Sequence, residues 1–208
     1  MNRSTPRRKP QSPAKADARR IALDVLQDVS CADAYASLSL NKRLQDRSLD
    51  ARDREFITTL VYGTLEHRLR LDHVLDAHLR EPKLPPLLRD LLRMSAYQLL
   101  FLDRVPEHAV VDEAVKIVKI LMPHAAGLIN GVLRNLIRGK ADIRWPEDPV
   151  SYLSVYHSVP RWLVERLMEA YGPETAEQIV AYRQPEHALT LRPNRMRLDP
   201  KAWERRMD

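Results

Sequence analysis

The densest group of side chains that are able to bind a metal ion lies between residues 67 and 78. It contains His67, Asp72, His73, Asp76 and His78. Only Asp72 and Asp76 stand four residues apart, the spacing that places two side chains on one face of a helix. The three histidines fall on different faces, so the spacing favours separate surface and boundary positions, and we expect no metal site.

Sequence patterns of the common catalytic and nucleotide-binding sites are absent. The chain has no nucleophile elbow, no phosphate-binding loop and no GxGxxG fingerprint, and no glycine follows Gly172. The single cysteine, Cys31, excludes an internal disulfide and a multi-thiolate metal site, and it lacks the neighbours that activate a thiol. We therefore expect no catalytic residue and no bound cofactor in this chain.

The basic side chains are a stronger functional signal, because they are unevenly distributed. The chain has a formal net charge of +6. Residues 1–20 contain seven basic side chains and one acidic side chain, Asp17, so the remaining residues are balanced in charge. A basic tail favours binding to phosphates, where released counterions drive association, although a solubilising tail without a partner is the alternative. The candidate RNA contacts in this region are Arg7, Arg8, Lys9, Lys15, Arg19 and Arg20.

A second basic cluster follows residue 190 and surrounds Trp203. Arginine close to an aromatic side chain suits RNA, whose bases are able to stack as well as pair. Arg192 and Arg195 are the candidate contacts here, and a solvated charged face is the alternative interpretation.

The pattern of apolar residues predicts helices for most of the chain. Residues 1–16 contain three prolines among Ser, Arg and Lys and are typical of a disordered tail. From Asp17, apolar residues recur with a helical period, and Asp50 is the predicted N-cap of a further helix. The pattern is ambiguous near Gly63 and residues 66–68, where a bend and a break are both compatible with it.

Proline separates the later helices. Helices are predicted over residues 87–102, 107–121 and 124–138, and the four-residue spacing of Gly127 and Gly131 favours a close helix crossing. Residues 142–159 form a connector that contains Pro and Trp, followed by a helical pair over 162–171 and 174–183.

The end of the chain shows the first strand-like alternation, at Leu189 and Leu191. A single strand has no sheet to join, so we interpret residues 184–208 as the start of a second, truncated domain. No apolar run is long enough to span a bilayer and no secretory signal is present. Together with the single cysteine, this predicts a cytoplasmic protein.

Three stretches, in order and at natural spacing, resemble the NusB-like fold. They read LDARDREF (49–56) with VYGTL (61–65), LRMSAYQLL (92–100) with VP (105–106) and VDEAV (111–115), and NGVLR (130–134). The resemblance implies an RNA-binding helical domain over residues 17–140. It also singles out Arg54 and Arg134, either as RNA contacts or as members of ion pairs that lock helices together.

The following segments, HSVPRWL (157–163), YG (171–172) and LTLRPN (189–194), resemble the family of ribosomal RNA small subunit methyltransferase B. In that family a NusB-like domain and a connector, here residues 141–183, precede an RNA-recognition-like α/β subdomain and a catalytic domain. The resemblance implies an all-α bundle that recognises small-subunit ribosomal RNA for cytosine carbon-5 methylation. S-adenosylmethionine and the catalytic cysteines are expected only on a longer parent chain. A NusB-type antitermination adaptor, which binds RNA and a protein partner, is the alternative.

Overall fold

The computed structural model describes residues 17–46, 49–182 and 194. Within these ranges every regular element is a helix, in agreement with the predicted all-α class. The predicted tail over residues 1–16 and the strand-like segment at 189–191 lie outside the described residues.

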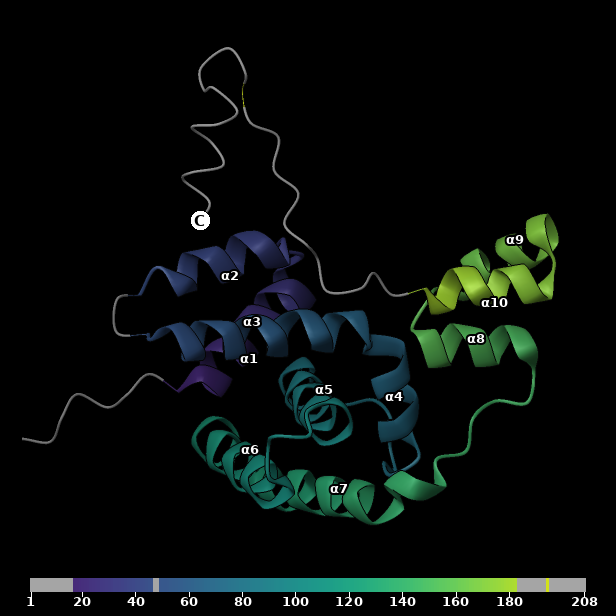
Figure 1. Ribbon diagram of the computed structural model, residues 1–208. Helices are drawn as coiled ribbons and strands as arrows, with labels where there is room; N and C mark the ends of the chain where they lie inside the picture. The colour runs from purple at the N-terminus through teal and green to yellow at the C-terminus, as the bar shows by residue number, and fades with distance from the viewer. Residues whose placement is uncertain (1–16, 47–48, 183–193, 195–208) are drawn as a thin grey trace, which may run out of the picture.

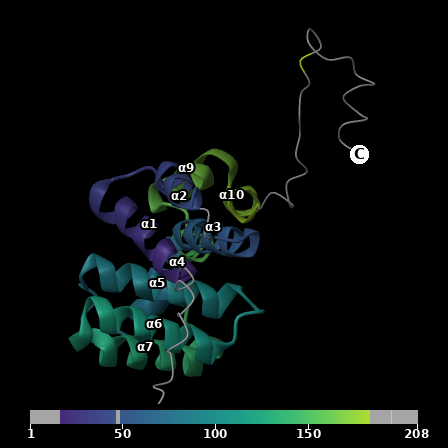
Figure 2. The same ribbon diagram turned by 90° about the vertical axis from the view of Figure 1, so that its left-hand side faces the viewer.

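Seven helices form an N-terminal bundle in which α5 is the central element. Figures 1 and 2 show α1, α2 and α3 on one side of α5, with α6 and α7 on the other side. Their bounds are α1 Ala18–Ala32, α2 Ala36–Leu44, α3 Ala51–Glu66, α4 Arg68–Asp76, α5 Pro86–Phe101, α6 Glu107–Leu121 and α7 Ala126–Gly139.

Side-chain caps fix the starts of two of these helices. The Asp17 carboxylate accepts a hydrogen bond from the backbone N–H of Arg19 at 3.0 Å. Asp50 accepts one from the backbone N–H of Asp53 at 2.8 Å, which confirms it as the predicted N-cap. The ambiguous joint after Gly63 is a break, because α3 ends at Glu66 and α4 begins at Arg68.

One apolar core holds the bundle together and draws on all seven helices. Helix α5 is buried along most of its length. Buried members, one from each helix in chain order, are Leu23, Leu40, Leu60, Leu71, Leu91, Val118 and Leu133. Such a core, and not local propensity, supplies most of the stability of helices of this length.

Gly63 lets α5 approach α3 closely. A Cβ atom added at Gly63 would lie 2.0 Å from Cζ of Tyr97, well inside van der Waals contact. The ring of Tyr97 therefore occupies the space that any other residue at position 63 would need.

The glycine pair of α7 does not have the packing role that its spacing predicts. A Cβ atom added at Gly127 or Gly131 would meet no atom within 4 Å. The prediction of a close helix crossing at this pair is therefore wrong, because this face of α7 points away from the core. A short 3₁₀ helix, Pro123–Ala125, immediately precedes α7.

Three further helices form an arm that packs beside α4. After a short 3₁₀ turn, Lys140–Asp142, the chain forms α8 Pro149–His157, α9 Arg161–Tyr171 and α10 Pro173–Ala181. Figure 1 shows the arm grouped next to α4 and apart from α6. Helix α8 lies in the segment that we interpreted only as a connector. The buried apolar centre of the arm consists of Leu153, Val164 and Val180.

Candidate nucleic-acid interface

The first turn of α1 holds two of the predicted RNA contacts in different environments. Arg19 is half-buried, and its Nε donates a hydrogen bond to Oε1 of the buried Gln98 at 2.8 Å. Its guanidinium also lies 5.1 Å from the centre of the Phe56 ring. Burial lowers the pKa of the Arg19 guanidinium, although Glu113 and Asp17 act in the opposite direction. Arg19 thus joins α1 to α3 and α5.

The side chain of Arg20 is 37% exposed. Its Nε lies 3.0 Å from Oδ1 of Asp24, one turn later on α1. An exposed pair at this spacing contributes little to stability, about 0.3–0.5 kcal/mol. Arg20 is therefore able to exchange this partner for a phosphate at small cost.

A surface hollow lies beside Arg19, between α3 and the turn that follows α5. Its volume is about 570 Å³. It is lined by Arg52, Glu55, Phe56 and Thr59 of α3, and by residues 101–105. We call this feature the α3–α5 hollow. Phe56 belongs both to the hollow and to the Arg19 contact, so the hollow adjoins the start of α1.

The α3–α5 hollow combines aromatic and charged groups. Arg52 and Arg104 are exposed at its edge, where Glu55 and Asp103 balance their charges. Sequence reasoning missed Arg52 and Arg104, because each is one arginine among many until the fold places it beside Phe56. Arg52 stands four residues before Phe56 on α3, but no periodicity or local spacing links Arg104 to either residue.

The two signature arginines of the bundle lie on opposite sides of α5. Arg54, near the start of α3, donates a hydrogen bond to the carbonyl oxygen of Asp46 at 3.2 Å. Arg134 is exposed on α7, where its Nε donates to Oδ1 of Asn130 at 2.9 Å. Neither contact is an ion pair between helices. Since α3 and α7 flank α5 from opposite sides, the fold does not bring Arg54 and Arg134 into one site (Figure 2).

The remaining predicted contacts lie outside the described residues. These are Arg7, Arg8, Lys9, Lys15, Arg192 and Arg195. The first four precede Asp17, so in sequence they come before the start of α1.

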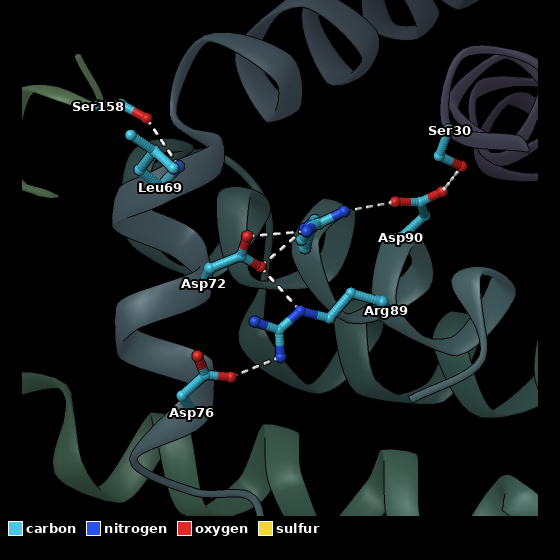
Figure 3. Close-up of polar contacts among 8 residues, drawn as sticks. Ser30, Leu69, Asp72, Asp76, Arg89, Asp90 and Ser158 are labelled. Carbon is cyan, nitrogen blue, oxygen red and sulfur yellow. Dashed lines mark hydrogen bonds and ion pairs between the residues drawn. The ribbon is translucent and has the colours of Figure 1, made fainter. Parts of the chain in front are cut away.

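The acidic residues of the His-rich segment belong to a charged network between α4 and α5 (Figure 3). Asp72 accepts hydrogen bonds from Arg89 at 2.8 Å and from Arg93 at 2.7 and 2.8 Å. Arg89 also pairs with Asp76 at 2.6 Å. Asp72 and Asp76, the two carboxylates with the spacing of one helix face, are thus both paired with arginines of α5.

The network continues to α1 through Asp90, whose side chain is 5% exposed. Asp90 pairs with Arg93 at 2.9 Å and accepts hydrogen bonds from Gln27 and Ser30 of α1. These ion pairs and hydrogen bonds hold α1, α4 and α5 together.

The histidines of the segment are used in packing. His67 stacks on Phe101 with ring centres 4.1 Å apart, and His73 stacks on Trp145 at 5.5 Å. Burial lowers the pKa of His78. Across the described ranges, no three His, Cys, Asp or Glu side chains are placed to hold a metal ion. Within the same ranges, no helix has the length and apolar character needed to cross a membrane.

Two family models match the sequence. The NusB family model matches residues 16–138, which comprise nearly all of the seven-helix bundle. A second model, described as the Methyltr_RsmF/B-like, ferredoxin-like domain, matches residues 159–208 and so includes α9 and α10.

Two kinds of relatives are similar in sequence to this chain. The probable ribosomal RNA small subunit methyltransferase B of Bacillus subtilis is 38% identical over 89% of this chain and 42% of its own length. The transcription antitermination protein NusB of a Nocardioides species is 32% identical over 62% of this chain and 98% of its own length. The chain thus spans about two fifths of the first methyltransferase relatives that it matches.

A solved structure has the same fold as the bundle. The structure of the antitermination factors NusB and NusE in complex with double-stranded RNA superposes with a TM-score of 0.54. The match covers 59% of this chain and 94% of the other, at 22% identity. Because a family model covers more than half of the sequence and an antitermination protein aligns along almost its whole length, the chain belongs to the NusB family.

Proposed function

We propose that this chain is the RNA-recognition region of a methyltransferase that modifies cytosine carbon 5 in small-subunit (16S) ribosomal RNA. The observation that carries the proposal is the order of the two family matches. A NusB bundle over residues 16–138 is followed by a methyltransferase-type ferredoxin-like match over 159–208. The relatives named as ribosomal RNA methyltransferases align across this whole arrangement.

The surface that would bind RNA begins at the basic tail and continues over the start of α1 into the α3–α5 hollow. The tail supplies positive charge, Arg20 supplies an accessible guanidinium, and the hollow adds Arg52 and Arg104 next to Phe56. Arginine close to an aromatic ring suits unpaired bases of structured RNA. Arg19 supports this surface by holding Phe56 and Gln98 in place.

Methyl transfer itself would belong to a catalytic domain of the longer relatives, with S-adenosylmethionine as methyl donor. The charged clusters of the described bundle support this division of roles. Arg93 pairs with Asp72 of α4 and with Asp90 of its own helix, and these ion pairs stabilise the fold. In this proposal the bundle selects and holds the RNA.

An antitermination adaptor is the second candidate function. The Nocardioides antitermination protein aligns over 98% of its own length, and the solved complex contains NusB, NusE and RNA. The segment from residue 151 onward favours the methyltransferase role, because that relative aligns with only 62% of this chain.

The proposal is tested by measuring the affinity of the whole chain for labelled small-subunit ribosomal RNA hairpins by fluorescence anisotropy. The salt concentration is varied between about 50 and 200 mM, because each phosphate contact contributes about 0.7–0.9 to the slope of log affinity against log salt. We expect a steep loss of affinity with salt. A variant with R7A, R8A and K9A should bind more weakly and with a shallower slope.

Arg166→Ala is the matched control, since Arg166 is an exposed arginine of α9, 75% exposed and far along the chain from the tail. It should leave the affinity and the slope unchanged. Absence of salt-dependent binding at low ionic strength would refute RNA recognition. A rise in RNA affinity on addition of the antitermination factor NusE would favour the adaptor instead.

A further inference from the structure

One arginine at the contact between arm and bundle lies close to three aromatic rings. The guanidinium of Arg70, on α4, lies 4.2 Å from the ring centre of Tyr156, 5.1 Å from Phe101 and 5.2 Å from Trp145. These rings come from α8, from α5 and from the segment that joins bundle and arm. A single cation–π contact contributes about 0.5–2 kcal/mol, depending on its desolvation. Arg70 thus binds both units and the segment between them.

Ser158, in the HSVPRWL stretch (157–163), provides a second link between arm and bundle. Its Oγ accepts a hydrogen bond from the backbone N–H of Leu69 at 2.8 Å (Figure 3). Leu69 is in the first turn of α4, and the residue before that helix makes no side-chain cap of its own. Ser158, at the end of α8, therefore caps a helix of the bundle from 89 residues away.

The backbone at Ser158 is in a conformation that suits this role. Its φ is +59°, the left-handed region that side-chain-bearing residues other than Asn and Asp rarely adopt. This turn ends α8 and lets Ser154 bind the carbonyl oxygen of Val159 at 2.7 Å. Backbone strain of this kind persists only where the surrounding structure fixes the residue, and it is concentrated at functional positions.

A third contact anchors the connecting segment. A ring nitrogen of His73, on α4, lies 2.8 Å from the carbonyl oxygen of Arg144, and the His73 ring stacks on Trp145. The segment is thus held at its middle as well as at both ends.

We propose that Arg70 and Ser158 form a clasp that fixes the direction of the arm relative to the bundle. Apolar packing alone is a weak determinant of direction, because it is not directional and the buried apolar cluster of the arm is small. The Arg70 guanidinium and the left-handed Ser158 have defined geometries, so they select one orientation.

The role of the clasp in catalysis depends on the proposed function. RNA held by the bundle would then be presented at a constant distance and angle to the arm. Arg70 and Ser158 are positioning residues in this scheme. Neither lines the α3–α5 hollow, although Arg70 contacts Phe101, which does. The clasp itself is a property of the free chain and does not depend on RNA binding.

The test measures the distance between bundle and arm directly. Spin labels are placed on cysteines introduced at Lys119 of α6 and Glu169 of α9, both of which are exposed. The exposed native Cys31 is first changed to serine. Pulsed electron–electron double resonance on the whole chain should give one narrow distance distribution. We expect Arg70→Met and Ser158→Gly each to lose this single narrow peak and give a broad distribution.

Two controls separate the clasp from general effects. Arg68→Met removes the same charge from an exposed site on the same helix and should keep the narrow peak. Ser158→Asn keeps a hydrogen-bond acceptor at a residue type that tolerates the left-handed backbone, so it should also keep the peak. Circular dichroism reports whether each variant retains its helices, and Tyr156→Leu replaces Arg70→Met if that variant unfolds.

An unchanged narrow peak in the clasp variants would overturn the proposal, and so would equal broadening in Arg68→Met. RNA affinity measured on the same proteins keeps the two proposals apart. Broadening with unaltered RNA affinity supports the clasp, and broadening in a chain that binds no RNA still supports the clasp while it refutes the proposed function.

Discussion

Gly63 and Tyr97 come from two of the stretches that resemble the NusB-like fold, and the structure explains both by their contact with each other. The Tyr97 ring fills the space beside the α carbon of Gly63, where α3 and α5 cross. A residue pair of this kind is easily mistaken for a functional motif. Here the pair lets α3 and α5 approach each other. Tyr97 stands 34 positions after Gly63, so local spacing does not reveal the contact.

We predict that Gly63→Ala destabilises the chain. Alanine favours a helix by up to about 1 kcal/mol over glycine, but the added Cβ would overlap the Tyr97 ring. Overpacking of a core costs about 1–3 kcal/mol, so a net loss in the free energy of unfolding is expected. Urea denaturation monitored by circular dichroism measures it.

Gly131→Ala is the matched control for this prediction. It makes the same change inside a helix where no atom lies within 4 Å of the added Cβ, so it should leave stability unchanged or raise it slightly. If Gly63→Ala were as stable as Gly131→Ala, the close approach of α3 and α5 would not be the reason for glycine at position 63.

At the scale of the elements, α1 and α2 are joined by one acidic side chain. Asp28 accepts hydrogen bonds from Ser39 at 2.6 Å and from Arg43 at 2.7 Å. These bonds hold the pKa of the Asp28 carboxyl below its ordinary value of 3.8. A carboxyl whose pKa is lower in the folded state adds stability above pH 3.8, and this stability is lost as the pH falls through the folded pKa.

We predict that Asp28→Asn lowers the free energy of unfolding near neutral pH but not in acid. The effect is at most about 1 kcal/mol, because the Asp28 side chain is 39% exposed and solvent screens the pair. Urea unfolding at intervals between about pH 6 and about pH 3 should show the variant and the parent converging at the acidic end. Asp33→Asn, which changes the same charge just after α1, is the control. A difference that persisted undiminished in acid would contradict the assignment.

Helix ends were the most predictable feature of the fold, and the reasons are local. Proline before α6, and aspartate before α1 and α3, act within one turn of the residues that they affect. Helix α8 escaped prediction because Val150, Tyr152, Leu153 and Tyr156 are distributed around it without a single apolar stripe. β-Branched and aromatic residues also have low helix propensity, so its packing on α4 decides its structure.

The candidate site was less predictable than the helices. The sequence singles out Arg19 as a basic residue beside a basic tail, but its hydrogen-bond partner, Gln98, is 79 residues away. Arg52 reaches the hollow from α3, and Arg104 reaches it from the turn that follows α5. Local spacing contains no information on such pairs, so charge alone could not distinguish a supporting arginine from an accessible one.

At the scale of the whole molecule, bundle and arm differ greatly in the apolar cores that they bury. All seven bundle helices contribute to one large core, while the buried apolar residues of the arm are Leu153, Val164, Ala176 and Val180. Each buried large apolar side chain contributes about 1.5–3 kcal/mol, which must offset the entropy of ordering its part of the chain. The arm by itself is therefore close to the limit of stability, and its contacts with α4 supply a substantial part of what holds it.

We predict that the arm opens before the bundle does. Native-state hydrogen exchange should show that the amides of α8, α9 and α10 exchange through a partial unfolding of lower free energy than the global transition that exposes α5. Arg70→Met should speed exchange in the arm more than in α5, because Arg70 holds the arm through Tyr156 and Trp145 but contacts α5 through Phe101, the last residue of that helix. Equal protection of α5 and α9 in the parent chain would show that bundle and arm unfold as one cooperative unit. The small core of the arm would then not be its weak point.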